Sequence, residues 1–187
     1  LTNAFEEMPN SRLVLVWGSN PVQSWSPWWP FFLEARRRGA KLITIDPRYT
    51  PTATRSDLWL PIRPGTDVIL AWALIHQILE QGWADTAYVT RHTVGPFLVR
   101  ADNGQFLKAP ASGSETDSGF LVWDRQTGRL EEASQAQEPA LTGEYRVNGV
   151  VCRPAFELLR QAASAYPLQL AAEKTGLKED QILALAR

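Results

Sequence analysis

Apolar blocks separated by polar residues divide the first part of the chain into predicted strands and a connecting helix. Leu13–Trp17 is a continuous apolar run, which is typical of a strand covered on both faces. Residues 27–38 have a helix-forming composition, with Ser26 as a candidate N-cap and Gly39 as a candidate C-cap. Residues 41–46 form a second apolar run. The three segments together predict a strand–helix–strand unit with parallel strands.

Two further segments extend this unit. Residues 58–62 predict a short strand at a sheet edge, because Pro61 cannot donate a backbone hydrogen bond. Residues 67–81 have the strongest helical pattern, capped by Thr66 or Asp67 and apolar on almost all sides, which indicates a buried helix. We interpret His76, inside this helix, as a core residue rather than a catalyst.

The second part of the chain has a different pattern. Residues 85–91 predict a short helix, and residues 95–151 consist of short alternating runs that predict an antiparallel or irregular β insertion. Residues 111–118 are polar enough to be mobile. Residues 154–165, 167–175 and 179–187 predict three closing helices. The expected fold class is therefore α/β: a single three-layer, Rossmann-like domain over residues 1–187 with a mainly parallel sheet, an irregular β insertion and closing helices.

Composition and charge exclude several kinds of partner. The 187 residues carry 19 basic and 20 acidic side chains, so the net charge of −1 does not favour nucleic acid. The single cysteine, Cys152, cannot form an internal disulfide, and we interpret it as a small buried residue. Apolar runs are too short to cross a bilayer, so we expect no direct membrane insertion. Since the chain starts without methionine and ends within a helical pattern, we expect a piece of a longer protein.

Polar loops follow each predicted strand, at residues 18–21, 46–50 and 63–67. In an open parallel sheet, ligands bind at the carboxyl ends of the strands. Any one of these loops is compatible with an ordinary turn. The combination is more specific: Gly18 allows a ligand close to the backbone, and Ser19 and Asn20 offer uncharged donors. These features favour a phosphate or a polar ring as ligand.

Charged residues in the second and third loops favour a nucleotide. Asp46 ends the second strand, near where dinucleotide-binding folds place a carboxylate on ribose hydroxyls. Arg48 can bind a phosphate with two hydrogen bonds, or pair with Asp46. Asp67 can accept two parallel donors from a guanine edge, or it can simply cap its helix.

Absent motifs narrow the chemistry. A Gly-x-Gly-x-x-Gly sequence is missing after the first strand, which weakens a nicotinamide or flavin site, and a P-loop sequence is missing altogether. A Gly-x-Ser-x-Gly elbow is also missing, so hydrolase chemistry has no support. The aromatic residues between the first strand and the helix could form a stacking platform, but packing of the loop–helix junction or of a neighbouring domain is the simpler interpretation. These residues are Trp25, Trp28, Trp29, Phe31 and Phe32.

Three ordered motifs resemble one known family. They are Trp17-Gly18-Ser19-Asn20-Pro21, the segment from Ile45 to Ala53, and the segment from Asp57 to Asp67. In order and approximate spacing they resemble the molybdopterin oxidoreductases of the dimethyl sulfoxide reductase type. The resemblance covers most of the chain but is vaguer over residues 96–148.

The resemblance implies a role for each loop. The first loop would contact one pterin dinucleotide, the second its ribose and phosphates, and the third its guanine. The implied cofactor-binding residues are Trp17, Gly18, Ser19, Asn20, Asp46, Pro47, Arg48, Thr50, Gly65, Thr66 and Asp67. The resemblance assigns no catalytic and no metal-ligating residue to this chain.

The resemblance also implies a function. The chain would be a domain of an oxidoreductase, of a kind used in anaerobic respiration, that carries bis(molybdopterin guanine dinucleotide) with molybdenum or tungsten. The domain would bind one dinucleotide and position the metal centre for oxygen-atom or electron transfer. Expected partners are an iron–sulfur electron-transfer subunit and the other domains of the same catalytic subunit, and an iron–sulfur cluster can lie elsewhere in the full protein. The alternative is a cofactor-free interaction module of the same fold that binds a partner through its Trp/Phe cluster. The compartment stays open between prokaryotic cytoplasm and periplasm, with membrane association through partner subunits.

Overall fold

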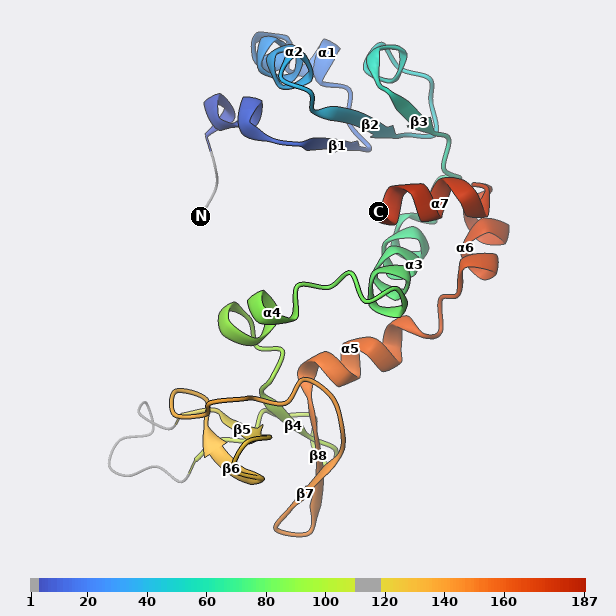
Figure 1. The fold of residues 1–187 in the computed structure, drawn as a ribbon. Helices are drawn as coiled ribbons and strands as arrows, with labels where there is room; N and C mark the ends of the chain where they lie inside the picture. Colours follow the sequence, from blue (N-terminus) through green and yellow to red (C-terminus); the bar gives the residue numbers. More distant parts are fainter. Residues whose placement is uncertain (1–3, 110–118) are drawn as a thin grey trace. The chain divides into compact units, whose positions relative to one another are not determined.

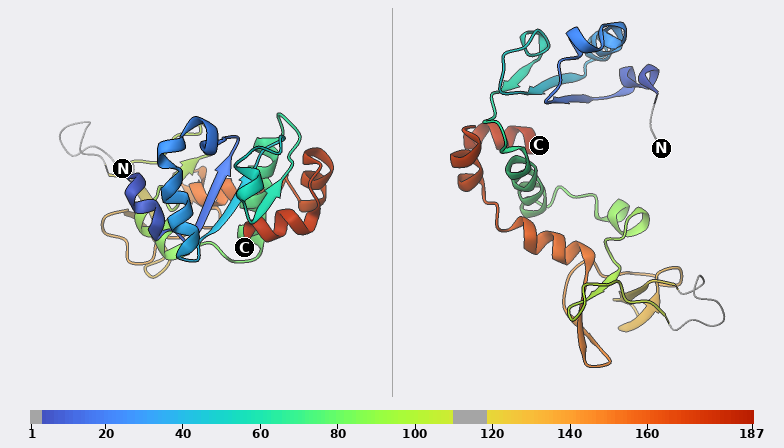
Figure 2. Two further views of the ribbon diagram at one scale, coloured as in Figure 1. Left: turned by 90° about the horizontal axis from the view of Figure 1, so that it is seen from above. Right: turned by 180° about the vertical axis from the view of Figure 1, so that it is seen from behind.

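The computed structural model describes residues 4–109 and 119–187, which form two compact units (Figures 1 and 2). The first unit comprises Leu1–Leu74 and Tyr166–Arg187, and the second comprises Ile75–Ala165. Helix α3 (Asp67–Glu80) begins in the first unit and ends in the second. Residues 111–118, which we expect to be mobile from their composition, lie outside the described residues.

A parallel sheet forms the centre of the first unit. Its strands are β1 (Leu13–Trp17), β2 (Lys41–Ile45) and β3 (Leu58–Leu60), in the order β1-β2-β3. Both pairs are parallel, with Leu13 opposite Lys41 and Ile43 opposite Leu58. The predicted parallel pairing and the predicted edge position of β3 are confirmed. Strand β3 ends at Leu60, directly before Pro61, because proline cannot continue the ladder.

Helices cover both faces of this sheet (Figure 1). On one face, Val16 and Leu42 pack with Phe32 of α2 (Trp29–Arg37) and with Met8 of the 3₁₀ helix η1 (Phe5–Asn10). On the other face, Ile43 and Ile45 pack with buried residues of α3, α6 (Leu168–Thr175) and α7 (Glu179–Ala186). Alternate residues of a strand point to opposite faces, so β2 supplies both cores. The three layers confirm the predicted α/β fold class.

Strand β1 differs from the prediction that it is covered on both faces. Leu13 and Leu15 are 48% and 40% exposed. They share a sheet face with Ile43 and Ile45, but the buried residues of α3, α6 and α7 pack against β2 and β3. An apolar run therefore identifies a strand here without showing that a second helical layer reaches it.

The β1–β2 connection is more divided than a single helix over residues 27–38. It consists of α1 (Pro21–Ser24), the 3₁₀ helix η2 (Ser26–Trp28) and α2. Ser26 begins η2 and does not cap a helix with its side chain, so the predicted N-cap is wrong. Each of these helices has a proline in its first turn, where the missing N–H costs no hydrogen bond. Helix α2 ends before Gly39, which has a φ of +97°.

Helix α3 confirms the predicted helix but is not buried all round. Leu70 and Ala73 are completely buried, whereas Val68 is 65% exposed. His76 is half-buried and makes no hydrogen bond through its ring with any described residue, so it is not the fully buried core residue that the pattern indicated.

The second unit contains the predicted antiparallel insertion. Strands β4 (Leu98–Arg100), β8 (Val150–Pro154) and β7 (Tyr145–Val147) form one antiparallel sheet, and β5 (Leu121–Asp124) pairs with β6 (Arg129–Glu132) in a hairpin. Helix α4 (Thr86–His92) is capped by Asp85, whose Oδ1 accepts from the Tyr88 amide at 2.9 Å. Helix α5 (Ala155–Ala163), together with α6 and α7, confirms the three predicted closing helices.

Among the described residues, none of the helices has both the length and the apolar character needed to cross a membrane. Cys152 is completely buried in β8, as expected, and burial raises the pKa of its thiol.

Candidate cofactor-binding site

The loops after β1 and β2 and the start of α3 meet at the carboxyl edge of the parallel sheet. The Trp17 indole Nε1 donates to Asp67 Oδ1 at 2.6 Å, which joins the end of β1 to the start of α3. The Gly18 amide donates to the Ile45 carbonyl at 2.9 Å, which joins the start of the first loop to the end of β2. Residues that are 50 positions apart in the sequence therefore lie side by side at this edge.

The β1–α1 loop turns at Gly18 and is held in place by Asn20. Gly18 has a φ of +60°, in the left-handed region that favours glycine, and a Cβ there would have open space around it. The Asn20 amide is used internally, because its Oδ1 accepts from Thr52 at 2.7 Å and its Nδ2 donates to Gln23 at 2.6 Å. Ser19 is half-buried, and its hydroxyl makes no hydrogen bond with any described residue. Of the two predicted uncharged donors, Ser19 is the one left available.

In the loop after β2, a carboxylate and a guanidinium lie close in sequence but do not pair. Asp46 is 8% exposed, and its Oδ1 accepts from the backbone amide of Arg48 at 2.7 Å. The Arg48 guanidinium is exposed and forms no ion pair or hydrogen bond with the part of the chain that is described. The alternative prediction, that Arg48 pairs with Asp46, is therefore wrong. Pro47 is exposed between them. Thr50 is 7% exposed, and its hydroxyl accepts from the Ala53 amide at 3.2 Å, which supports the 3₁₀ helix η3 (Ala53–Arg55).

The third loop leads into helix α3. Gly65 has a φ of +79° and open space where a Cβ would be. The Thr66 hydroxyl donates to the Arg63 carbonyl at 2.7 Å, so it stabilises the turn and does not cap the helix. The Asp67 carboxylate accepts from Trp17 and from no amide of its own helix among the described residues. The Asp67 side chain therefore does not cap α3, and the simpler interpretation of this residue is wrong.

Three residues that sequence reasoning missed organise these loops. Thr52 is completely buried and holds the Asn20 side chain. Trp59 of β3 donates from Nε1 to the Asp46 carbonyl at 2.8 Å, and its ring lies 4.7 Å from that of Tyr49. The Arg63 side chain donates to the Glu173 carbonyl at 2.8 Å and so ties the third loop to α6. All three lie within the motifs that carry the family resemblance, and their place in those motifs is the sequence signal that could have identified them.

The aromatic cluster is mainly a packing feature. Phe32 is 5% exposed in the core, and Trp29 stacks on it with ring centroids 5.2 Å apart. Phe5 of η1 stacks on Trp28, the last residue of η2, with ring centroids 4.6 Å apart. Trp25 is 49% exposed, and its ring meets the edge of Phe5. The interpretation as a packed loop–helix junction agrees with these contacts.

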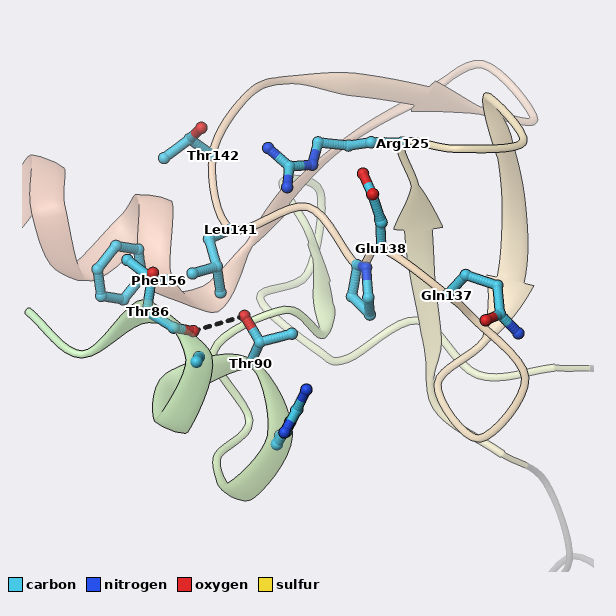
Figure 3. Close-up of a pocket in the computed structure, with 11 residues that line it drawn as sticks. Thr86, Thr90, Arg125, Gln137, Glu138, Leu141, Thr142 and Phe156 are labelled. Carbon is cyan, nitrogen blue, oxygen red and sulfur yellow. Dashed lines mark hydrogen bonds between the residues drawn. The ribbon is translucent and has the colours of Figure 1, made fainter.

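A separate pocket lies in the second unit and contains no predicted site residue (Figure 3). It has a volume of about 500 Å³, and its walls come from α4, the segment 137–142 and Phe156 of α5. Arg91, Arg125 and Glu138 all line it, so its charge is mixed and favours no single ligand class. Within the described ranges, 4–109 and 119–187, there is no group of three or more His, Cys, Asp or Glu side chains that could hold a metal ion.

The first unit is a three-layer α/β unit whose polar loops lie at the carboxyl edge of a parallel sheet, which is where open α/β sheets bind their ligands. Residues 1–172 match the family model described as molybdopterin oxidoreductase. The chain therefore belongs to the molybdopterin oxidoreductase family, as the three motifs predicted, and it corresponds to a domain of the catalytic subunits of these enzymes.

Named relatives agree with this assignment. The chain is 39% identical over 184 residues to a protein of Halobacterium salinarum provisionally named as the catalytic subunit of a dimethyl sulfoxide reductase, a match that covers 94% of this chain and 22% of that protein. It is 32% identical over 199 residues to the alpha subunit of chlorate reductase from Ideonella dechloratans, covering 98% of this chain and 22% of that protein. The chain thus spans about a fifth of the length of the curated relatives it matches.

A solved structure supports the fold. Acetylene hydratase from Pelobacter acetylenicus aligns with a TM-score of 0.54 and 23% sequence identity, over 94% of this chain and 16% of that chain. At this identity the similarity shows the fold alone.

Proposed function

We propose that this chain binds one guanine dinucleotide of a bis(molybdopterin guanine dinucleotide) cofactor and positions its molybdenum or tungsten centre within a larger catalytic subunit. The observation that carries the proposal is the meeting of three polar loops at one sheet edge, shown by the contacts Trp17–Asp67 and Gly18–Ile45. The metal centre, when bound, supplies the oxygen-atom or electron transfer. The residues of this chain bind and orient the dinucleotide.

The groups left available at this edge fit such a ligand. The unpaired Arg48 guanidinium can bind a phosphate with two hydrogen bonds. Asp46 uses one carboxylate oxygen for the Arg48 amide, and its second oxygen can accept from ribose hydroxyls. The open space at Gly18 and Gly65 lets a ligand approach the backbone.

Asp67 is the residue proposed to bind guanine. A carboxylate oxygen can accept more than one hydrogen bond, so the bond from Trp17 leaves Asp67 able to accept the two parallel donors of a guanine edge.

The proposed partners follow from the length of the relatives and from their names. The remaining domains of the catalytic subunit would enclose the cofactor, since this chain presents one set of nucleotide-contacting loops. Relatives named as alpha subunits, such as that of dimethylsulfide dehydrogenase from Rhodovulum sulfidophilum, support further subunits in the enzyme. We assign an iron–sulfur subunit the transfer of electrons to or from the metal.

Replacing Asp67 by alanine in the full catalytic subunit tests the proposal. We expect Asp67→Ala to lower the bound pterin, guanine and metal content much more than it lowers the melting temperature. Stranding guanine donors in a dry pocket costs about 1–3 kcal/mol, whereas the stability of the protein loses one part-buried hydrogen bond, from Trp17, worth about 0.5–1.5 kcal/mol. Cofactor content is measured by metal analysis and by the guanine nucleotide released on hydrolysis.

Asp85→Ala is the matched control. Asp85 is also a carboxylate at a helix N-terminus, but it caps α4 in the second unit, whereas the three loops belong to the first. We expect Asp85→Ala to lower the melting temperature while the cofactor content stays normal. Normal cofactor content in Asp67→Ala would refute the guanine assignment.

A further inference from the structure

We infer that Trp17 acts as a positioning residue for guanine recognition: its indole N–H holds the Asp67 carboxylate in the orientation that accepts the base. This inference rests on the proposed function. It gives Trp17 a role through Asp67, in place of the direct contact with the cofactor that the family resemblance implied.

The contact itself is short and joins distant parts of the chain. Trp17 Nε1 lies 2.6 Å from Asp67 Oδ1, across 50 positions of sequence, and the pair is partly buried. A hydrogen bond from a neutral donor to an ionised acceptor is shorter and stronger than one between neutral groups. The bond therefore restricts the rotamer of Asp67 at the start of α3.

Both ends of this bond are rigidly supported. Trp17 is the last residue of β1, in register with Ile45, and its ring packs against the core cluster on the α3 side of the sheet. The first turn of α3 is closed by the Thr66 carbonyl, which accepts from the Ile69 amide at 3.0 Å and the Leu70 amide at 3.2 Å. The indole thus reaches Asp67 from a fixed strand, and the carboxylate stands on a fixed helix turn.

Without the indole donor, the carboxylate has nearby alternatives. The amides of Asp67 and Val68 donate to no other described residue, and an aspartate at the beginning of a helix readily turns back to such amides. A carboxylate turned to its own helix no longer presents two oxygens to a ligand. Trp17 prevents this rotation by supplying a competing donor.

The inference predicts a change in base selectivity. Hypoxanthine lacks the exocyclic amino group of guanine, so the ratio of GDP to IDP affinity reports whether a carboxylate accepts both guanine donors. A net hydrogen bond at an open site is worth about 0.5–1.5 kcal/mol, which corresponds to a GDP preference of about two- to tenfold in the unaltered chain. In Trp17→Phe we expect this ratio to fall to about one, because the phenyl ring keeps most of the packing and removes only the donor.

Trp59→Phe is the matched control. Trp59 is also an indole donor at this edge of the sheet, but its Nε1 bonds the Asp46 carbonyl and not Asp67. Guanine and hypoxanthine nucleotides share the same ribose and phosphates. We therefore expect Trp59→Phe to leave the ratio of the two affinities unchanged, whatever it does to each of them.

Two-dimensional ¹H–¹⁵N spectra of the 187-residue chain titrated with GDP and with IDP measure these affinities in the millimolar range. They also display the Trp17 indole N–H directly, assigned by its absence in Trp17→Phe. We expect this signal to lie downfield, to move in Asp67→Asn and to shift on addition of GDP.

The outcomes separate the inference from the proposed function. An unaltered chain that does not distinguish GDP from IDP contradicts guanine recognition by Asp67, and with it both proposals. A chain that prefers GDP, and keeps the same preference in Trp17→Phe, overturns the positioning role alone. Loss of preference in Trp17→Phe with retention in Trp59→Phe supports the inference.

Discussion

Hydrogen bonds divide the polar side chains at the sheet edge into those that bond within the protein and those that bond to no described residue. Asn20 and Thr50 resemble ligand-binding residues in the sequence, yet their polar groups bond to Thr52, Gln23 and Ala53. Ser19 and Arg48 have no such bonds among the described residues. The first pair shapes the loops, and the second pair remains available for a ligand.

Thr52 provides a test at the scale of one hydroxyl group. Its Oγ1 donates to Asn20 Oδ1 at 2.7 Å and accepts from the Val22 amide at 3.3 Å, in a completely buried position. Thr52→Val keeps the shape but strands both partners, so we expect the free energy of unfolding to fall by about 1–3 kcal/mol. Urea unfolding measures this change. Thr54→Val, at an exposed hydroxyl that bonds only locally, should stay within about 0.5 kcal/mol, and equal effects of the two variants would contradict the assigned role of Thr52.

At the scale of elements, a buried carboxylate organises the β5–β6 hairpin in the second unit. Asp124, at the end of β5, is completely buried. Its Oδ1 accepts from the amides of Gln126 and Thr127, and its Oδ2 accepts from those of Gln137 and Glu138, at 2.5–3.1 Å. One side chain therefore closes the hairpin turn and attaches the segment after β6 to it.

Asp124 also predicts how stability depends on pH. Burial alone would raise the pKa of its carboxyl, but the four backbone donors outweigh burial and hold the pKa below the ordinary value of 3.8. A group with a lowered pKa in the folded state stabilises the fold above its unfolded pKa and loses that contribution as the pH falls through the folded value. We expect Asp124→Asn to lower the urea midpoint at pH 7, with the gap to the unaltered chain narrowing below about pH 4.

Asp102→Asn is the control for that experiment. Asp102 also has a lowered pKa, first because it accepts a side-chain hydrogen bond from Arg100, but it lies on the surface. Surface ion pairs contribute little to stability, so its urea midpoint at pH 7 should hardly change. A gap between Asp124→Asn and the unaltered chain that stayed constant down to pH 2 would contradict the role given to the Asp124 charge.

For the whole chain, the important fact is that it covers about a fifth of the length of its relatives. Its first unit presents one set of loops at one sheet edge. A cofactor with two dinucleotides needs a second binding surface, which the remaining domains would provide. A ligand bound to this chain alone stays in contact with water on its open side.

We therefore expect the 187-residue chain to fold, to bind GDP only with a millimolar dissociation constant, and to be catalytically silent. Each hydrogen bond at a wet site is exchanged against water for about 0.5–1.5 kcal/mol, and immobilising the nucleotide offsets much of the sum, which leaves about −4 kcal/mol. Calorimetric titration with GDP, beside Asp46→Ala as control, measures the affinity. Micromolar binding would mean that the site is complete without its partner domains, and turnover of an oxo-acceptor would overturn the expectation of silence.

Local sequence signals were sufficient for the elements that repeat a simple pattern. The apolar runs at Leu13–Trp17 and Lys41–Ile45, joined by a helical connection of crossover length, predicted the parallel pair, because parallel strands need such a crossover. The motifs from Trp17 to Asp67 indicated the family by resemblance, through their order and approximate spacing, and the family model confirms it.

The tertiary structure decided which of these residues meet and which are occupied. The exposure of Leu13 and Leu15 depends on how far the helices on one face extend across the sheet, and a local pattern carries no information on that distance. The bond from Trp17 to Asp67 depends on the register of β1 with β2 and on where α3 begins. Such contacts join positions far apart in the sequence, so their physical cause lies in the packing of the whole unit rather than in any segment of it.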